Sequence, residues 1–169
     1  MQDVDRPTRD GPTRDGPTAE TKTADEMFLR VAIEQARIGR DEGGVPIGAA
    51  LVVDGQVLGA GRNRRVQMGS SIRHGETDAL ELAGRQPAAV YRRATMYTTL
   101  SPCDMCSGAI LLYQIGRVVI GENETFRGAE DHLRQRGVEV VNLDSSESKS
   151  LMRGFIAQHP EIWKEDIGE

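Results

Sequence analysis

The hydrophobic pattern divides the chain into a polar N-terminal stretch and a longer part with regular apolar spacing. Residues 1–22 have no apolar period, and a short Pro/Thr/Arg/Asp/Gly repeat occupies residues 6–17. A stretch of this kind cannot bury enough apolar surface to offset the entropy lost on ordering. We therefore predict a flexible tail over residues 1–22 and one domain over residues 23–169.

The first element predicted in the domain is a helix. Thr23 and Glu26 are spaced as a capping box, and Gly43-Gly44 supplies the stop. The apolar positions between them recur at helical spacing: Phe28, Val31, Ala32 and Ala36.

A hairpin is predicted next. Residues 45–53 are apolar and rich in β-branched side chains, which is typical of a buried strand. Asp54-Gly55 is a strong two-residue turn signal, so residues 56–63 should return as the partner strand.

Helices and strands alternate through the rest of the chain. Further helices are predicted over residues 74–83, 103–114, 127–136 and 145–158 and after Pro160, with strands over 95–99, 117–121 and 138–142. Alternation of this kind implies parallel pairing with right-handed crossovers, while the hairpin makes the sheet mixed. The fold class is therefore α/β, a three-layer α/β/α domain around a central mixed five-stranded sheet.

Composition and charge narrow the function classes. The chain has 169 residues, with 38% hydrophobic and 28% charged residues, which is ordinary for a globular domain. No apolar run approaches the roughly 18 residues of a membrane span, and no signal-peptide pattern opens the chain. A cytoplasmic protein without a membrane partner is expected. The net charge of −5 argues against a nucleic-acid partner, which usually meets a basic face.

Cys103 and Cys106 are separated by two residues at the start of a predicted helix. Such thiols can face one Zn²⁺ ion, and a helix N-terminus stabilises thiolate charge. His74 opens the preceding predicted helix, and both helix starts should meet at one edge of the sheet. These residues predict one zinc ion per chain with three protein ligands, the arrangement of catalytic rather than structural sites.

Glu76 lies two residues after His74, near the metal but not needed as a ligand. There a carboxylate can accept a proton from an activated water and return it to a leaving amine. His-x-Glu followed by Pro-Cys-x-x-Cys is the signature of zinc-dependent base deaminases.

Two other functions remain possible for the Cys-x-x-Cys and His-x-Glu motifs. The Cys-x-x-Cys pair could be a redox dithiol, but the flanking Trp-Cys-Gly-Pro context is missing. The site could also belong to a zinc-stabilised binding module without turnover. Glu76 opposes that reading, because a structural site has no use for a carboxylate beside an open metal position.

Several motifs closely resemble fungal-type cytosine deaminase of the cytidine deaminase superfamily, across roughly residues 27–169. They are residues 43–48 (GGVPIG), 74–76 (HGE), 98–106 (TTLSPCDMC), 121–123 (GEN) and 163–169 (WKEDIGE). The resemblance implies a cytidine deaminase-like fold, zinc at His74, Cys103 and Cys106, proton transfer by Glu76, and a homodimer.

The resemblance also implies substrate contacts. It places the Asn63 amide on the edge of a pyrimidine and the Gly75 N–H on the ring carbonyl. It places the Ser101 carbonyl against the leaving amine, and Asp166 against that amine or against His74. The residues implied to stack on or cap the base are Ile47, Phe126 and Trp163.

The implied reaction is deamination of free cytosine to uracil and ammonia in pyrimidine salvage, with 5-substituted cytosines as further substrates. The alternatives are another free base, such as guanine or isocytosine, and adenosine in tRNA. Three positions depart from the family pattern as we know it: Arg73 and Asp78 introduce charges near His74, and Val66 replaces an expected aromatic pocket residue. These departures bear on the substrate more than on the reaction.

Overall fold

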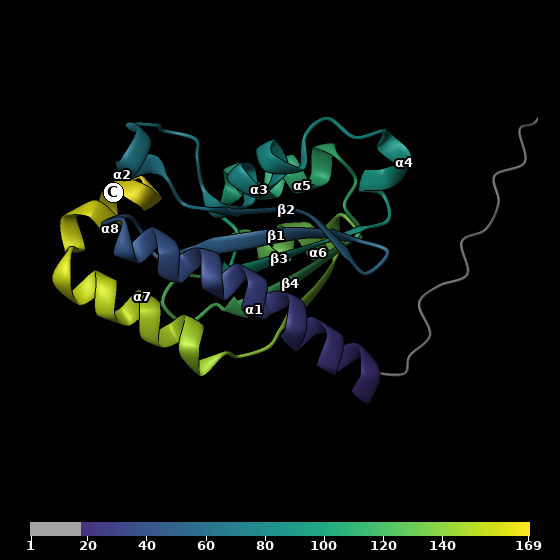
Figure 1. Ribbon diagram of the computed structural model, residues 1–169, viewed down its shortest axis with the longest axis horizontal. Helices are drawn as coiled ribbons and strands as arrows, with labels where there is room; N and C mark the ends of the chain where they lie inside the picture. The colour runs from purple at the N-terminus through teal and green to yellow at the C-terminus, as the bar shows by residue number, and fades with distance from the viewer. Residues whose placement is uncertain (1–17) are drawn as a thin grey trace, which may run out of the picture.

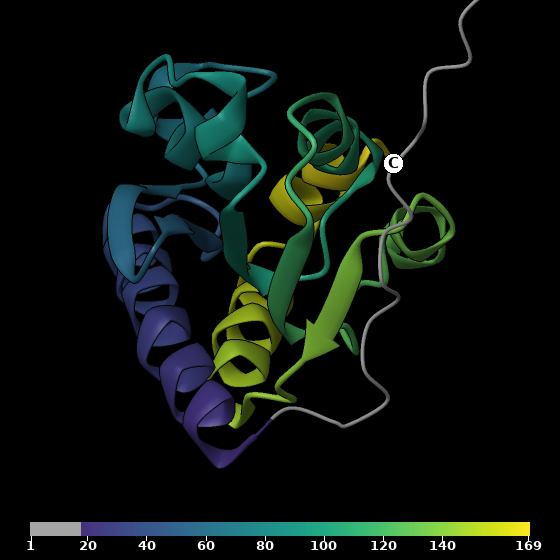
Figure 2. The ribbon, with the colours of Figure 1, turned by 90° about the vertical axis from the view of Figure 1, so that its right-hand side faces the viewer.

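A computed structural model describes residues 18–169, so most of the predicted tail lies outside the described residues. A five-stranded sheet stands between two layers of helices (Figures 1 and 2). The strands are β1 (Gly48–Val53), β2 (Gln56–Arg62), β3 (Ala94–Leu100), β4 (Arg117–Glu122) and β5 (Glu139–Asn142). The helices are α1 (Ala19–Asp41), α2 (Arg65–Met68), α3 (Gly75–Ala83), α4 (Ala88–Tyr91), α5 (Asp104–Leu112), α6 (Glu130–Gln135), α7 (Ser146–Gln158) and α8 (Pro160–Ile167).

The sheet has the mixed topology that the sequence predicts. Its strand order is β2-β1-β3-β4-β5, in which β1 is antiparallel to both neighbours and the β3–β4 and β4–β5 pairs are parallel. Asp54 and Gly55 both have positive φ angles, 49° and 76°, as a two-residue hairpin turn with the right twist requires. The predicted fold class is confirmed.

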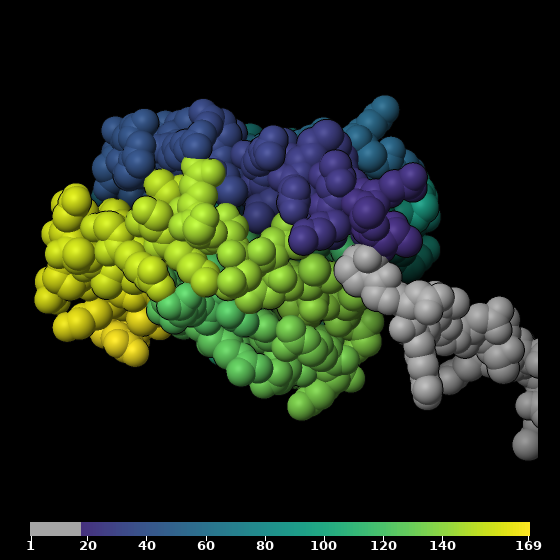
Figure 3. All heavy atoms as spheres, turned by 90° about the horizontal axis from the view of Figure 1, so that it is seen from below, coloured from purple at the N-terminus to yellow at the C-terminus, as the bar shows by residue number. Residues whose placement is uncertain are grey.

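Each face of the sheet has its own apolar core. Helices α3, α5 and α6 pack on one face through Ala79, Ile110 and Leu133 against strand residues such as Leu51 and Met96. Helices α1 and α7 cover the other face, where they lie side by side (Figure 3). The sheet is therefore buried on both sides, which explains why its central strands are apolar rather than alternating.

A third apolar cluster lies at the end of the sheet where β3 finishes. It joins the segment before β1 to α7 and α8 and includes Val45, Ile47, Leu100, Met152 and Trp163. Because α8 packs here, the C-terminal part of the chain closes over this end of the sheet. The candidate site lies beneath it.

Some element boundaries differ from the sequence prediction. Helix α1 begins at Ala19, not after Thr23: the Thr18 hydroxyl caps it by accepting from Thr21 N, and Thr23 Oγ1 donates to Ala19 O. The short helices α2 and α4 were not predicted, because four residues are too few to show a helical period. Within residues 18–169, no helix combines the length and hydropathy needed to span a membrane.

Candidate active site

Two helix N-termini meet at this end of the sheet. His74 is the N-cap of α3 and Cys103 the N-cap of α5, both with extended backbone angles. Strand β3 leads into Cys103 through Ser101-Pro102, so the strand end sets where α5 starts. The convergence predicted from the sequence is thus observed.

His74, Cys103 and Cys106 form a potential metal site. Their donor atoms all lie within 4.8 Å of one another, and His74 Nδ1 is 3.5 Å from Cys103 Sγ. Two sulfurs and an imidazole are a donor set that Zn²⁺ takes in tetrahedral sites, and three protein donors leave one position for water or substrate. The residues present therefore fit a catalytic zinc ion.

The electrostatics of the donors also suit a cation. A hydrogen bond from Cys106, helped by His74, lowers the pKa of Cys103 to about 4, so this sulfur is a thiolate at neutral pH. The contact with Cys103 and burial raise the pKa of Cys106. Burial alone would lower the pKa of His74, but its contact with Cys103 and the charge of Asp166 outweigh burial and raise it.

Glu76 lies beside these donors and is buried. Its Oε1 accepts from Thr98 Oγ1 at 3.0 Å, and its Oε2 is 3.3 Å from Cys106 Sγ. Burial, with the charge of Cys103, raises the pKa of the Glu76 carboxyl. A carboxyl held beside the metal donors in this way is placed to transfer protons, as general acid–base catalysis requires.

A narrow enclosed cavity of about 20 Å³ adjoins the donors and Glu76. It is lined by Ile47, His74, Glu76, Leu100, Ser101, Cys103, Phe126, Trp163, Asp166 and Ile167. A wider outer hollow of about 560 Å³ shares His74, Cys103, Phe126, Asp166 and Ile167 with it. The cavity and the outer hollow are therefore neighbours.

The three aromatic and aliphatic residues implied as the base-binding walls all line the cavity. The rings of Phe126 and Trp163 meet edge to face, with centroids 5.9 Å apart and planes at 86°. Ile47 and Trp163 are each 7% exposed. Three segments far apart in the sequence thus supply an apolar enclosure suited to a flat ring.

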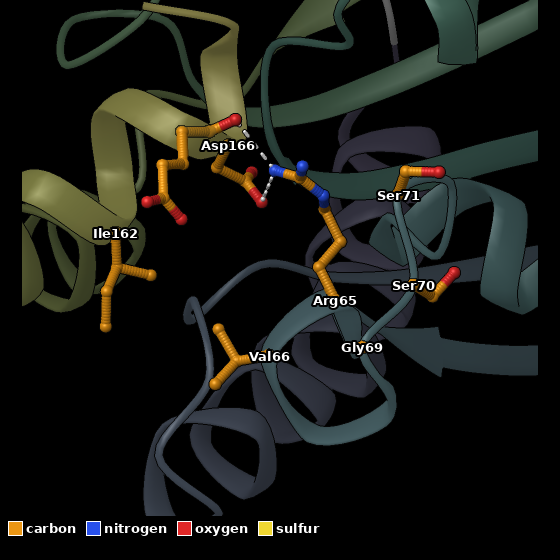
Figure 4. A pocket seen from close by; sticks show the side chains of 8 residues that line it. Arg65, Val66, Gly69, Ser70, Ser71, Ile162 and Asp166 are labelled. Atoms are coloured by element: carbon orange, nitrogen blue, oxygen red, sulfur yellow. Dashed lines mark hydrogen bonds and ion pairs between the residues drawn. The ribbon is translucent and has the colours of Figure 1, made fainter.

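Asp166 joins α8 to the rest of the site. Its carboxylate accepts two hydrogen bonds from Asn63 Nδ2, at 2.9 and 3.0 Å, and lies 4.0 Å from His74 Nε2. Arg65 donates to the same carboxylate at 3.1 Å and to the Glu165 carbonyl at 2.9 Å (Figure 4). Asp166 therefore lines the cavity and is held from behind by hydrogen bonds from Asn63 and Arg65.

Asn63 and Gly75 are not among the residues lining the enclosed cavity. Asn63 is fully buried behind Asp166, and its Oδ1 accepts from Arg65 N. Gly75 is buried at the first position of α3, where a helix N–H has no partner within the helix. Ser101 does line the cavity, and its hydroxyl donates to buried Glu130 at 2.9 Å. The contacts of these residues with a base remain predictions.

The structure adds residues that the sequence reasoning missed. Thr98 hydrogen-bonds to the Glu76 carboxylate, Arg65 to Asp166, and Glu130 to Ser101. Leu100 and Ile167 line the cavity. Thr98 could have been found from the alternation of the predicted strand 95–99, which places it on the same face of the sheet as Leu100. The contacts of Arg65 and Glu130 join segments that no local pattern connects.

Val66 does not enlarge the enclosed cavity. Its side chain is 46% exposed and lines a separate hollow of about 310 Å³ between α2 and α8 (Figure 4). Arg65 and Asp166 form the wall that this hollow shares with the site. The substitution therefore changes the packing outside the Arg65–Asp166 pair.

Comparison with known proteins agrees with this geometry. Residues 22–122 match the family described as "Cytidine and deoxycytidylate deaminase zinc-binding region". The chain is 53% identical to a cytosine deaminase of Candida albicans, over 86% of this chain and 97% of the relative. It is 39% identical to a tRNA-specific adenosine deaminase of Buchnera aphidicola, over 79% of this chain and 89% of the relative. Among solved structures, a protein from a study of tRNA:A34 deaminases aligns with a TM-score of 0.65 and 30% identity, covering 75% of this chain and 99% of that one.

Proposed function

The chain belongs to the cytidine and deoxycytidylate deaminase family, and we propose that it hydrolyses the free base cytosine to uracil and ammonia. The observation that carries this proposal is the enclosed apolar cavity that ends on His74, Cys103 and Glu76. The 53% identity to a cytosine deaminase over most of both chains supports the same substrate.

His74, Cys103 and Cys106 would hold the zinc ion. The Cys103 thiolate, whose pKa is lowered to about 4, would offset part of the cation's charge, and the buried Cys106 would serve as a ligand in its deprotonated form. When bound, zinc supplies a Lewis acid that makes water nucleophilic at neutral pH. The expected stoichiometry is one ion per chain.

Glu76 moves the protons. Its buried carboxylate would accept one proton from the attacking water and pass it to the ring nitrogen, then accept the second proton from the newly added hydroxyl and pass it to the departing amine. Thr98 orients this carboxylate through its hydrogen bond to Oε1. Cytosine and water are consumed, and uracil and ammonia are formed, so no other reactant is required.

The enclosure favours a free base over a nucleoside or a nucleic acid. The cavity is narrow, and Phe126, Trp163 and Ile167 line it beside the metal donors, which suits a flat base better than a base that carries a ribose. The outer hollow carries both charges, with Arg65 and Arg127 beside Asp104, Glu165 and Asp166. A mixed surface of this kind lacks the basic character that a phosphate backbone selects.

Substrate recognition is assigned to buried polar groups around the cavity. Asp166 and the Ser101 carbonyl would face the exocyclic amine, and the Gly75 N–H would face the ring carbonyl. Asn63 would contact the pyrimidine edge next to Asp166. Ile47, Phe126 and Trp163 would sandwich the ring, as the apolar lining allows.

A substrate panel tests the proposed function. Purified zinc-loaded protein is given cytosine, 5-methylcytosine, isocytosine, cytidine, guanine, adenine and an adenosine-containing tRNA anticodon hairpin, and ammonia release is followed. Cytosine should be turned over, with 5-methylcytosine as a second substrate. Turnover of cytidine, or of guanine or the hairpin in place of cytosine, would overturn the proposal.

We also propose that the protein is a homodimer. Ile72, Leu112 and Tyr113 are 62%, 73% and 39% exposed, and a groove of about 670 Å³ runs between α3, α4 and α5. Exposed apolar residues beside a groove are typical of a subunit interface. Light scattering should give twice the chain mass for the wild type and a smaller mass for Leu112→Asp. A monomeric wild type at micromolar concentration would contradict the proposal.

The cytoplasmic location stays a prediction.

A further inference from the structure

Two of the departures from the family pattern form a single structural feature. Arg73, before His74, donates to Asp78 at 2.8 Å, and Arg64, after Asn63, donates to the same carboxylate at 3.1 Å through Nε. We call Arg64, Arg73 and Asp78 the charge triad. It connects the end of β2 to the beginning of α3.

Asp78 is the centre of the charge triad and is entirely buried. Its side chain is 0% exposed, whereas those of Arg64 and Arg73 are 23% and 27% exposed. The carboxylate also accepts from the Arg62 backbone N–H at 3.1 Å. A buried carboxylate is stable only when it is paired and hydrogen-bonded, and both conditions are met here.

The charge triad holds the main chain on both sides of Asn63. Asp78 accepts from the residue before Asn63 and from the side chain of the residue after it. Asn63 itself donates its backbone N–H to Ile47 O at 2.8 Å and its side-chain amide to Asp166. The direction of this amide therefore depends on a backbone that Asp78 fixes.

The same triad reaches the metal-binding segment. Arg64 N donates to Arg73 O at 2.9 Å. This backbone hydrogen bond joins the same two segments whose arginine side chains both pair with Asp78. Arg73 directly precedes His74, and Asp78 N donates to His74 O at 2.9 Å. The buried Asp78 carboxylate thus holds two segments: the one that carries Asn63 and the one that carries His74 and Glu76.

We propose that Asp78, held by Arg64 and Arg73, is a positioning residue that sets the Asn63 amide relative to His74 and Glu76. This inference rests on the proposed function, because it assigns Asn63 to base binding. Small displacements of a recognition group are costly, since catalysis depends on near-attack geometry.

The test compares two buried aspartates. Asp78→Asn keeps the side-chain shape but removes the charge that both guanidinium groups share. Asp25→Asn is the matched control, because Asp25 is also buried and ion-paired, with Arg117, but lies at the opposite end of the sheet. The full-length zinc-loaded proteins are compared for KM and kcat with cytosine, zinc content, melting temperature, and the NMR signal of the Asn63 side-chain amide, assigned by its loss in Asn63→Ala.

Asp78→Asn should raise KM about tenfold or more, with zinc retained, and should shift the Asn63 amide signal. Asp25→Asn should lower the melting temperature without either change. A wild-type KM and an unshifted amide signal in Asp78→Asn would overturn the inference, and so would an equal rise of KM in Asp25→Asn. If Asp78→Asn does not fold, Arg73→Gln replaces it, with a smaller rise of KM expected and the same overturning result.

The controls separate the two proposals. Wild-type protein that releases no ammonia from cytosine contradicts the proposed function, whatever the variants do. The Asn63 amide signal is read without turnover, so it tests the positioning of Asn63 independently.

Discussion

Asp25 and Glu76 are buried carboxylates near opposite ends of the central sheet, and their partners differ. At the end remote from the cavity, Asp25 accepts from the Tyr97 hydroxyl at 2.9 Å and from two nitrogens of Arg117 at 2.7 and 2.8 Å. At the cavity end, Glu76 has a hydroxyl and a thiol as partners and no cation among the described side chains that hydrogen-bond to it.

The difference separates a stabilising site from a reactive one. A carboxylate paired with a guanidinium ties elements together, as Asp25 ties α1 to β3 and β4. Burial raises the pKa of Glu76, whose carboxyl hydrogen-bonds to no guanidinium among the described residues. Such perturbed groups in a cavity are typical of catalytic sites. Substitutions at each end should therefore affect different quantities.

The largest effect is expected at Glu76. Glu76→Gln preserves the shape and the hydrogen bond from Thr98 but cannot transfer a proton, so turnover should fall by about 10³-fold or more. Because burial raises the pKa of Glu76, its charged form costs stability above the ordinary carboxyl pKa of 4.5. The variant should be at least as stable as wild type when zinc-free. Ammonia release, zinc content and thermal unfolding measure these outcomes, and near-wild-type turnover would refute the role of Glu76.

The second prediction concerns the remote end. Asp25→Ala leaves the Arg117 guanidinium partly buried without its main partner, which should cost about 3 kcal/mol of unfolding free energy. KM and kcat should stay within about twofold of wild type, since the site lies at the other end of the sheet. Urea unfolding and steady-state kinetics check both. A large change in KM without loss of stability would show that the two ends are not independent.

Arg65 should show an intermediate effect at the cavity end. Arg65→Gln removes the guanidinium that holds Asp166 and the Glu165 carbonyl, while Asn63 continues to bind Asp166. Loss of one partly exposed charged hydrogen bond should weaken base binding by about 1 kcal/mol, or roughly fivefold in KM. Steady-state kinetics give KM and kcat. Glu161→Gln on α8, the helix that carries Asp166, serves as an exposed control. An unchanged KM would remove Arg65 from substrate binding.

The smallest expected effect is at Tyr97. Burial and the neighbouring Asp25 raise the pKa of the Tyr97 hydroxyl above its ordinary value of 10.0. The folded protein then keeps a proton that the unfolded chain loses above pH 10, so this contribution to stability is complete below pH 10 and declines above it. Tyr97→Phe should cost about 1 kcal/mol at pH 8 and flatten the decline above pH 10. Urea unfolding at several pH values measures this, and an identical alkaline decline in the variant would assign it to other groups.

Local patterns in the sequence were sufficient for the elements and the reactive groups. Apolar spacing and the Asp54-Gly55 turn predicted the five strands and the long helices, because each depends on neighbours within a few residues. His74, Cys103 and Cys106 stand in short motifs at helix starts, so the zinc site followed from residue type and spacing. The same motif predicts Glu76 as the proton carrier.

Tertiary structure alone decided what surrounds those groups. Asp166 is 103 residues from Asn63, and Asp78 is bound by arginines on two segments; no local period records such contacts. The early start of α1 and the short helices α2 and α4 likewise depended on capping and packing. The sequence by itself determined the fold class and the zinc-binding residues, since these arise from periodicity and chemistry. Only the folded chain determined the enclosure of the cavity and the burial of each carboxylate, because burial depends on distant segments packing together.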